Sequence, residues 1–251
     1  IDSSVTEIDE EACYECTILR EVVFHNKVIE IGRQAFGCCS NLRPVELPAG
    51  LLRVEHAAFS ECTSLQHIMI PATVHHFGSC IFEDCSSLES VVFVPRTTRI
   101  ELGYGMFWGC SNLRFVTLPH NVRSIPARFF MGCTLFAAIR IPPSVQLIER
   151  DAFSGSAIQS IVMLENVHQI DRQAFQNCAF LETVIIHSTN LNLGNNIFTN
   201  CPLLSVIKMY PWLWPKLFVS MNEHPEFIFK FLRHYQTQIL DVETPTDVLP
   251  F

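Results

Sequence analysis

The feature that most constrains this chain is a repeat of about 23 residues. Eight phenylalanines share one position of the repeat, at spacings of 23, 23, 25, 23, 23, 22 and 23: Phe36, Phe59, Phe82, Phe107, Phe130, Phe153, Phe175 and Phe198. Cys13 occupies the same position one period before Phe36. A unit of this size cannot bury its apolar side alone, so the repeat predicts units that stack on one another.

Two further columns accompany the phenylalanines. Three residues after Cys13 and after each repeat phenylalanine comes a cysteine, except in the seventh unit, where Ser156 takes its place. These cysteines are Cys16, Cys39, Cys62, Cys85, Cys110, Cys133, Cys178 and Cys201. An apolar residue comes three positions later, as at Leu42 and Leu65. We expect the cysteines to form a buried column of small free thiols.

Each unit then shows the alternation that is typical of a strand. Leu42, Val45 and Leu47 precede Pro48, and Phe136, Ile139 and Ile141 precede Pro142. Proline cannot donate to a ladder and so marks the end of the strand. The stretch that leads into Ala-Phe, as at 33–36, is expected to form a short helical or 3₁₀ turn. We therefore predict an α/β repeat solenoid with a parallel sheet and about nine units over residues 1–210.

The pattern I-x-x-I-x-x-x-A-F-x-x-C-x-x-L-x-x-V-x-L-P resembles the BspA-type leucine-rich repeat. One unit shows most of it, with Ile31, Ala35, Phe36, Cys39, Leu42, Val45, Leu47 and Pro48. The resemblance covers about four fifths of the chain. It implies a leucine-rich-repeat array with its sheet on a concave face, used for protein binding, and it supplies no catalytic residues.

After Tyr210 the repeat stops, and residues 211–251 are expected to form a helical C-terminal cap and tail. Phe227, Ile228, Phe231, Leu232 and Tyr235 have helical spacing, and two short helices split near Pro225 are predicted. Atypical terminal units cover the apolar end of a solenoid. The alternative is an aromatic anchor on a membrane surface, which Glu223, Glu226 and Asp241 disfavour because such helices usually carry a basic face.

Composition and motifs exclude several function classes. The net charge of -8 and the lack of a basic stripe disfavour nucleic-acid binding. No metalloprotease, phosphate-loop or nucleophile-elbow motif is present, and Cys13-x-x-Cys16 is explained by the repeat. We therefore expect no catalytic residue, metal site or cofactor, and no membrane contact. The His75–His76 pair is interpreted as part of a solvated loop.

The residues that alternate outward on the strands are the candidates for a binding site. Met69, Val92 and Phe115 are consecutive apolar side chains among them, and exposed apolar patches mark interaction surfaces. The alternative is that strands simply favour β-branched residues. The predicted partner-binding residues are His67, Met69, Val92, Phe115, Thr117 and Arg140.

Two functions remain open on the sequence alone. The first is a non-enzymatic module that binds a protein or peptide on its concave sheet, in the cytoplasm. An odd count of 11 cysteines and the absence of an Asn-x-Ser/Thr sequon favour that compartment. The second is a secreted or cell-surface adhesin, because the BspA-type family includes such proteins. Ile1 in place of Met indicates a fragment or a processed chain, for example after removal of a signal peptide.

Overall fold

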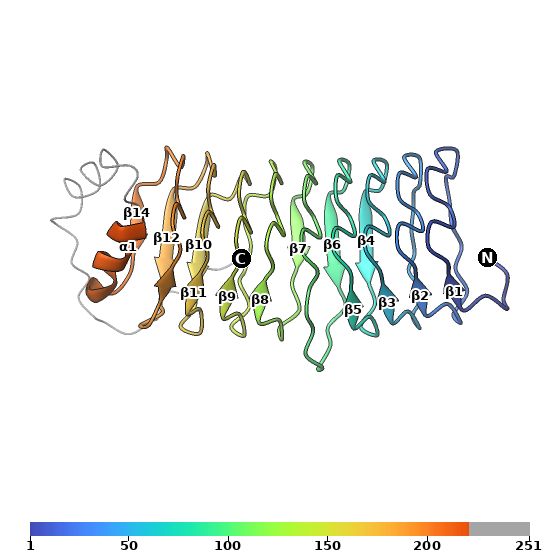
Figure 1. Cartoon of the computed structure of the whole chain (residues 1–251), viewed down its shortest axis with the longest axis horizontal. Coiled ribbons are helices and arrows are strands. Elements are labelled where there is room, and N and C mark those ends of the chain that lie inside the picture. Colours follow the sequence, from blue (N-terminus) through green and yellow to red (C-terminus); the bar gives the residue numbers. More distant parts are fainter. Residues whose placement is uncertain (221–251) are drawn as a thin grey trace.

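The protein forms a solenoid of stacked coils, shown side by side in Figure 1. The structure is a computed structural model, and it describes residues 1–220. We number the coils one to nine by Cys13 and the eight repeat phenylalanines that follow it. The helices expected over 227–235 and the tail from Asp241 lie outside the described residues.

The solenoid carries strands on two faces. The long-strand face has two three-stranded parallel sheets, β4-β6-β7 and β10-β12-β14. Their strands are β4 (His67–Ile70), β6 (Ser90–Phe93), β7 (Phe115–Thr117), β10 (Ser160–Met163), β12 (Thr183–Ile186) and β14 (Val206–Lys208). The parallel sheet predicted from the apolar alternation is thus confirmed.

Not every predicted strand forms. The alternation at 136–141 in coil six leads to no strand, which separates the two long-strand sheets. In coil two the strand is reduced to one bridge between Val22 and Val45. Pro44 lacks the backbone N–H that a strand donates to its neighbour, which explains why coil two forms no strand there. Nothing in the structure explains the missing strand of coil six.

The opposite side, the short-strand face, was not predicted as a sheet. It has two four-stranded parallel sheets, β1-β2-β3-β5 and β8-β9-β11-β13. The strands have two residues each: β1 (Glu7–Ile8), β2 (Glu30–Ile31), β3 (Arg53–Val54), β5 (His76–Phe77), β8 (Ser124–Ile125), β9 (Leu147–Ile148), β11 (Gln169–Ile170) and β13 (Asn192–Leu193). Each of these two-residue strands has one apolar residue that faces the core and one residue that points outward.

The turns before and after each phenylalanine form a third ladder instead of the predicted helical or 3₁₀ turn. Gln34 has φ of 51° and Cys38 has φ of 60°, and equivalent residues in the other coils share this left-handed conformation. A helix cannot continue through positive φ. Alternate N–H groups donate to the next coil, as from Gln34 to the carbonyl of His56 (2.9 Å) and from Phe36 to that of Ala58 (2.9 Å).

The core consists of columns that run along the solenoid. The repeat phenylalanines from Phe36 to Phe198 are buried, and neighbouring rings stack with centroids 5.1 to 5.9 Å apart. The seven cysteines from Cys39 to Cys201 in the second column are also buried, as predicted, whereas Cys16 in the first coil is half-buried. Each thiol donates to a backbone carbonyl of the preceding coil at 3.0 to 3.2 Å. All 11 cysteines of the chain lie within the described residues and are free.

Two helical segments cover the last coil, which confirms the predicted cap for this part of the chain. They are η1 (Pro211–Leu213) and α1 (Trp214–Ser220), and Figure 1 shows α1 at the end of the stack. Leu213 and Leu217 are buried. The carbonyl of Ser220 accepts the N–H of Asn196 at 2.8 Å, which replaces the bond that a tenth coil would supply.

Candidate functional site

The long-strand sheet β4-β6-β7 brings five of the six predicted binding residues together. His67 and Met69 come from β4, Val92 from β6, and Phe115 and Thr117 from β7. The register places Met69, Val92 and Thr117 in one row, and His67, Ser90 and Phe115 in the next. Phe115 is therefore diagonal to Val92, and the three apolar residues do not form a single row. Arg140 is exposed, but it lies on coil six, which has no strand.

Exposure singles out two side chains of this sheet. Met69 is 60% exposed and Phe115 is 53% exposed, whereas Val92 and Thr117 are half-buried. Apolar residues on the same strands that point inward, such as Ile68 and Val91, are buried. Met69 and Phe115 point outward from the two outer strands of the sheet, and we call these two exposed apolar side chains the Met69–Phe115 patch.

Two of the predicted residues are already engaged by the sheet itself. The Thr117 hydroxyl accepts the backbone N–H of Phe93 at 3.1 Å and so contributes to the ladder. His67 Nδ1 lies 2.9 Å from Ser90 Oγ, which orients the imidazole across neighbouring strands. These contacts fix the surface around the Met69–Phe115 patch, and they leave those two side chains free to contact a ligand.

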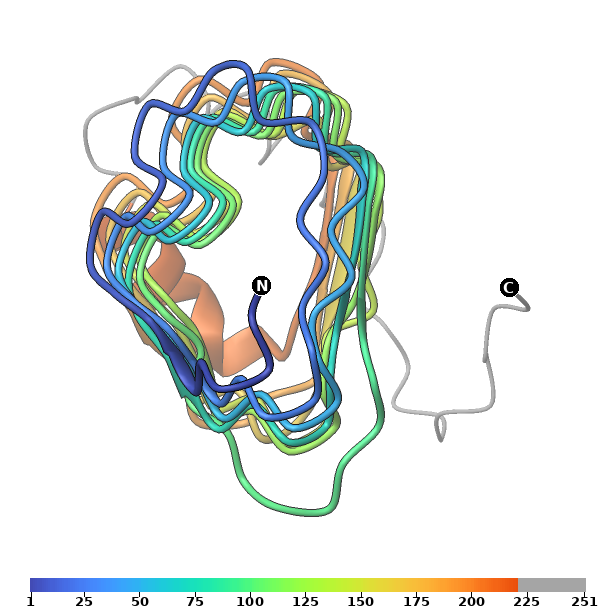
Figure 2. The ribbon, with the colours of Figure 1, turned by 90° about the vertical axis from the view of Figure 1, so that its right-hand side faces the viewer.

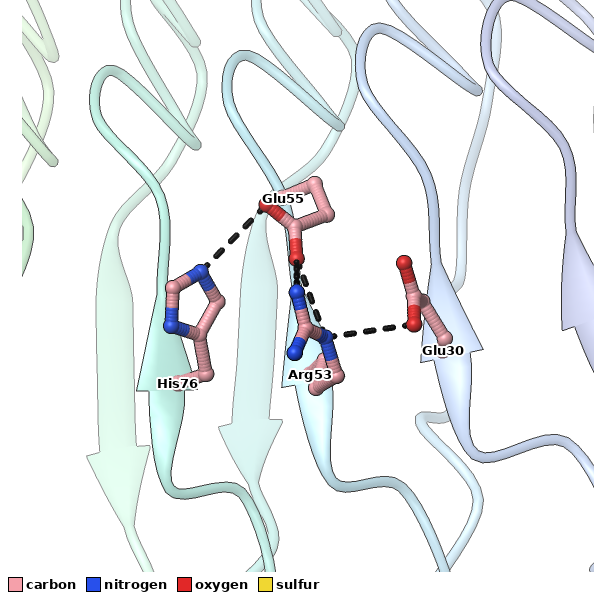
Figure 3. Close-up of polar contacts among 4 residues, drawn as sticks. All are labelled: Glu30, Arg53, Glu55 and His76. Atoms are coloured by element: carbon pink, nitrogen blue, oxygen red, sulfur yellow. Dashed lines mark hydrogen bonds and ion pairs between the residues drawn. The ribbon is translucent and has the colours of Figure 1, made fainter.

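The short-strand face carries a charged row that the sequence reasoning missed. Figure 3 shows Arg53 between two carboxylates, with Nε 3.2 Å from Glu30 Oε2 and Nη2 2.6 Å from Glu55 Oε1. His76 Nε2 lies 3.3 Å from Glu55 Oε2. The hydrogen bond to Glu55, and then the charge of Glu30, raise the pKa of Arg53. Glu7, Glu30, Arg53 and His76 share one repeat position, so the spacing could have revealed this row.

A pocket lies next to this row, where the repeat is irregular. It has a volume of about 530 Å³ and is lined by His75, His76, Ser79, Arg99, Glu101 and Tyr104, among others. The interpretation of His75–His76 as a solvated loop was wrong for His76, which lies in β5. Both imidazoles border the pocket.

The described part of the chain lacks two features that would point to other functions. Within residues 1–220, no group of three or more His, Cys, Asp or Glu side chains is arranged to hold a metal ion. In the same range, no helix has the length and hydropathy needed to cross a bilayer.

The fold defines the class of this protein as a solenoid repeat protein with two β faces and stacked phenylalanine and cysteine columns. The model of the BspA type leucine rich repeat region matches residues 1–103 and 100–210, in six copies. The chain belongs to this family, and the resemblance inferred from the repeat pattern is confirmed.

One solved structure agrees with this assignment, and a second is similar to the chain in sequence. A leucine-rich repeat protein from Bacteroides ovatus is 29% identical over 82% of this chain, with a TM-score of 0.75. The chain spans 53% of that protein, about half its length. A leucine-rich repeat protein from Treponema pallidum is 25% identical over 86% of this chain and 77% of its own, with a TM-score of 0.49. No curated protein matches the chain.

Proposed function

We propose that this protein is a non-enzymatic interaction module that binds a protein or peptide on the sheet β4-β6-β7. The observation that carries the proposal is the exposed Met69–Phe115 patch on a sheet whose other apolar side chains are buried or half-buried. Large apolar side chains near the centre of an interface contribute most of its binding energy. His67, Val92, Thr117 and Arg140 would surround this centre.

The rigidity of the sheet supports the same role. The central strand β6 pairs with β4 on one side and β7 on the other, and just before it the N–H of Glu89 donates to the carbonyl of Gln66 at 2.8 Å. A surface that does not rearrange loses little entropy on binding. The row of β-strands offers a partner a flat, preformed surface.

The test is a pull-down from lysate of the native host, read by mass spectrometry. Phe115→Arg introduces a charge into the patch, and we expect it to abolish capture of a partner that the wild type retains. Phe180→Arg is the matched control, because Phe180 is also 53% exposed but lies outside the long strands. Equal capture by wild type and a folded Phe115→Arg protein would show that this patch is not the binding site.

The cellular compartment stays a separate question. The cytoplasmic location predicted from the cysteine count finds no support in the comparisons, and the cell-surface alternative stays open. Titration of thiols in the native protein and after denaturation separates the two. Eleven free thiols after denaturation, the full count of the chain, would favour the cytoplasm. A lower count would indicate disulfides and favour the cell surface.

A further inference from the structure

The pocket on the short-strand face lies at the one long interval of the repeat. Phe82 and Phe107 are 25 residues apart, whereas the other intervals are 22 or 23. The extra residues fall between β6 and β7, in the loop that projects at the bottom of Figure 2. We call the hollow beside it the seam pocket, because one short-strand sheet ends at β5 and the next begins at β8. Only an isolated bridge between Ile100 and Val122 spans that seam.

The seam pocket has the size of a small-molecule site. Its volume of about 530 Å³ falls within the usual range for ligand pockets, roughly 300–1,000 Å³. Its floor includes buried Phe77, and its wall includes Tyr104, whose ring has the guanidinium of Arg128 5.8 Å from its centroid. The pocket therefore combines an apolar base with a polar rim.

Three side chains on that rim, Arg99, Ser79 and Tyr104, can donate hydrogen bonds to a ligand. Arg99 donates from Nη2 to Glu101 at 3.1 Å, and within residues 1–220 its Nε and Nη1 have no partner. The hydroxyls of Ser79 and Tyr104 have no partner in the same range. His75 Nδ1 lies 3.3 Å from the carbonyl of Thr73, which can only accept, so Nδ1 is the donor and Nε2 of the neutral ring is an acceptor.

The two carboxylates near the pocket are poor competitors for these donors. Glu55 is occupied by Arg53 and His76. The Glu101 side chain is 83% exposed, so water surrounds most of it. A ligand that supplies several acceptor oxygens would therefore complete the rim, and a guanidinium binds carboxylates through paired, charge-assisted hydrogen bonds.

We propose that the seam pocket binds a small organic acid with two or three carboxylates, held by Arg99 and by the Ser79 and Tyr104 hydroxyls, with His75 and His76 beside it. This site is independent of the Met69–Phe115 patch, because it lies on the opposite face. The failure of either proposal leaves the other intact.

The test uses citrate as the probe, measured by isothermal titration calorimetry at low salt. Arg99→Gln and Glu101→Gln break the same ion pair but change the charge in opposite directions. We expect Arg99→Gln to weaken citrate binding at least fivefold and Glu101→Gln to leave it unchanged or strengthen it. A purely structural role of the pair would move both variants the same way and would overturn the proposal.

Two further measurements test which class of ligand binds and whether it binds in the seam pocket. Arg33→Gln is the matched control, since Arg33 pairs with Glu10 at 3.0 Å outside the pocket, and it should bind citrate as the wild type does. Histidine NMR signals of His75 and His76 should shift on titration, which places the citrate. Absence of binding, tighter binding of inorganic phosphate, or an equal loss in Arg33→Gln would contradict the assignment.

Discussion

At the residue scale, the repeat phenylalanine is the largest contributor to the core of each coil. Phe130 is fully buried, and its ring lies 5.8 Å from that of Phe107 and 5.4 Å from that of Phe153. Each such ring therefore joins three coils. Removing one ring leaves a cavity that its two neighbours cannot fill without shifting the ladders on both faces.

We predict that Phe130→Ala lowers the free energy of unfolding by about 3–5 kcal/mol, the usual cost of a large-to-small change in a core. Urea unfolding followed by circular dichroism measures it. The matched control Phe180→Ala, at an exposed position, should change stability by less than about 0.5 kcal/mol. Similar losses for both variants would show that the stacked column does not set the stability.

Glycine serves a different purpose where coils approach closely. A Cβ at Gly78 would lie 2.2 Å from the backbone N of His56 in the preceding coil. No side chain can be accommodated there without separating the two backbones. The glycine thus permits the bond from its own N–H to the carbonyl of Val54, at 2.8 Å.

We predict that Gly78→Ala lowers the midpoint of thermal unfolding markedly more than Gly37→Ala. A Cβ at Gly37 would lie 3.0 Å from the Tyr14 ring, and its nearest backbone atom, the carbonyl oxygen of Gln34, would be 3.4 Å away. Differential scanning calorimetry of the two variants provides the comparison. An equal shift would mean that the close approach at Gly78 relaxes easily.

At the element scale, the cysteine column acts as a row of hydrogen-bond donors inside the coil. Cys85 Sγ donates to the carbonyl of Phe59 at 3.1 Å, and Cys110 Sγ donates to that of Phe82 at 3.0 Å. Burial raises the pKa of Cys85 to about 12 and that of Cys39 to about 11. These two thiols stay protonated at neutral pH, which suits a donor role and makes them poor nucleophiles.

This leads to a pH prediction with a definite sign. The folded state favours the neutral thiol, so its contribution to stability is complete below about pH 8.5, where unfolded thiols ionise. It is lost as the pH rises from there through about 12, the folded pKa of Cys85. Urea unfolding at pH 7, 9 and 10.5 should show a falling free energy of unfolding. Replacing Cys85 by Ser should reduce this slope, and an unchanged slope would contradict the assignment.

At the scale of the whole molecule, stability spreads from coil to coil through neighbour contacts alone. The helical cap therefore protects the last coil first. Besides the Asn196–Ser220 bond, Lys216 Nζ donates to the carbonyl of Leu191 at 3.0 Å, and the Trp212 indole donates to that of Thr189 at 3.0 Å. Loss of the cap would expose apolar surface and unpaired backbone at one end of the array.

We predict that Leu217→Ala, at a position that is 1% exposed, lowers the protection of amides in coil nine by about 2–3 kcal/mol. Coils three to five should keep their protection, because no cap residue touches them. Native-state hydrogen exchange with mass spectrometry resolves this gradient. Val219→Ala is the control in the same helix, at a position that is 69% exposed. Uniform loss along the chain would indicate that the array unfolds as one cooperative unit.

The sequence by itself determined the period, the identity of the buried columns, the long strands of most coils and the family. It could do so because each repeat position meets the same surroundings in every coil, so that one residue type recurs wherever burial demands it. Outward positions face solvent and carry no such constraint. The placement of Met69 and Phe115 was readable from alternation, but their exposure was not.

The tertiary structure alone decided the second β face, the left-handed turn ladder and the seam pocket. These features depend on how backbone groups of neighbouring coils pair, and two-residue strands such as β5 leave almost no pattern in the sequence. The pairing of Arg53 with Glu30, and the pocket that both His75 and Arg99 line, likewise require two coils side by side. Interactions between coils arise only when the stack has formed, which is why they had to be found in three dimensions.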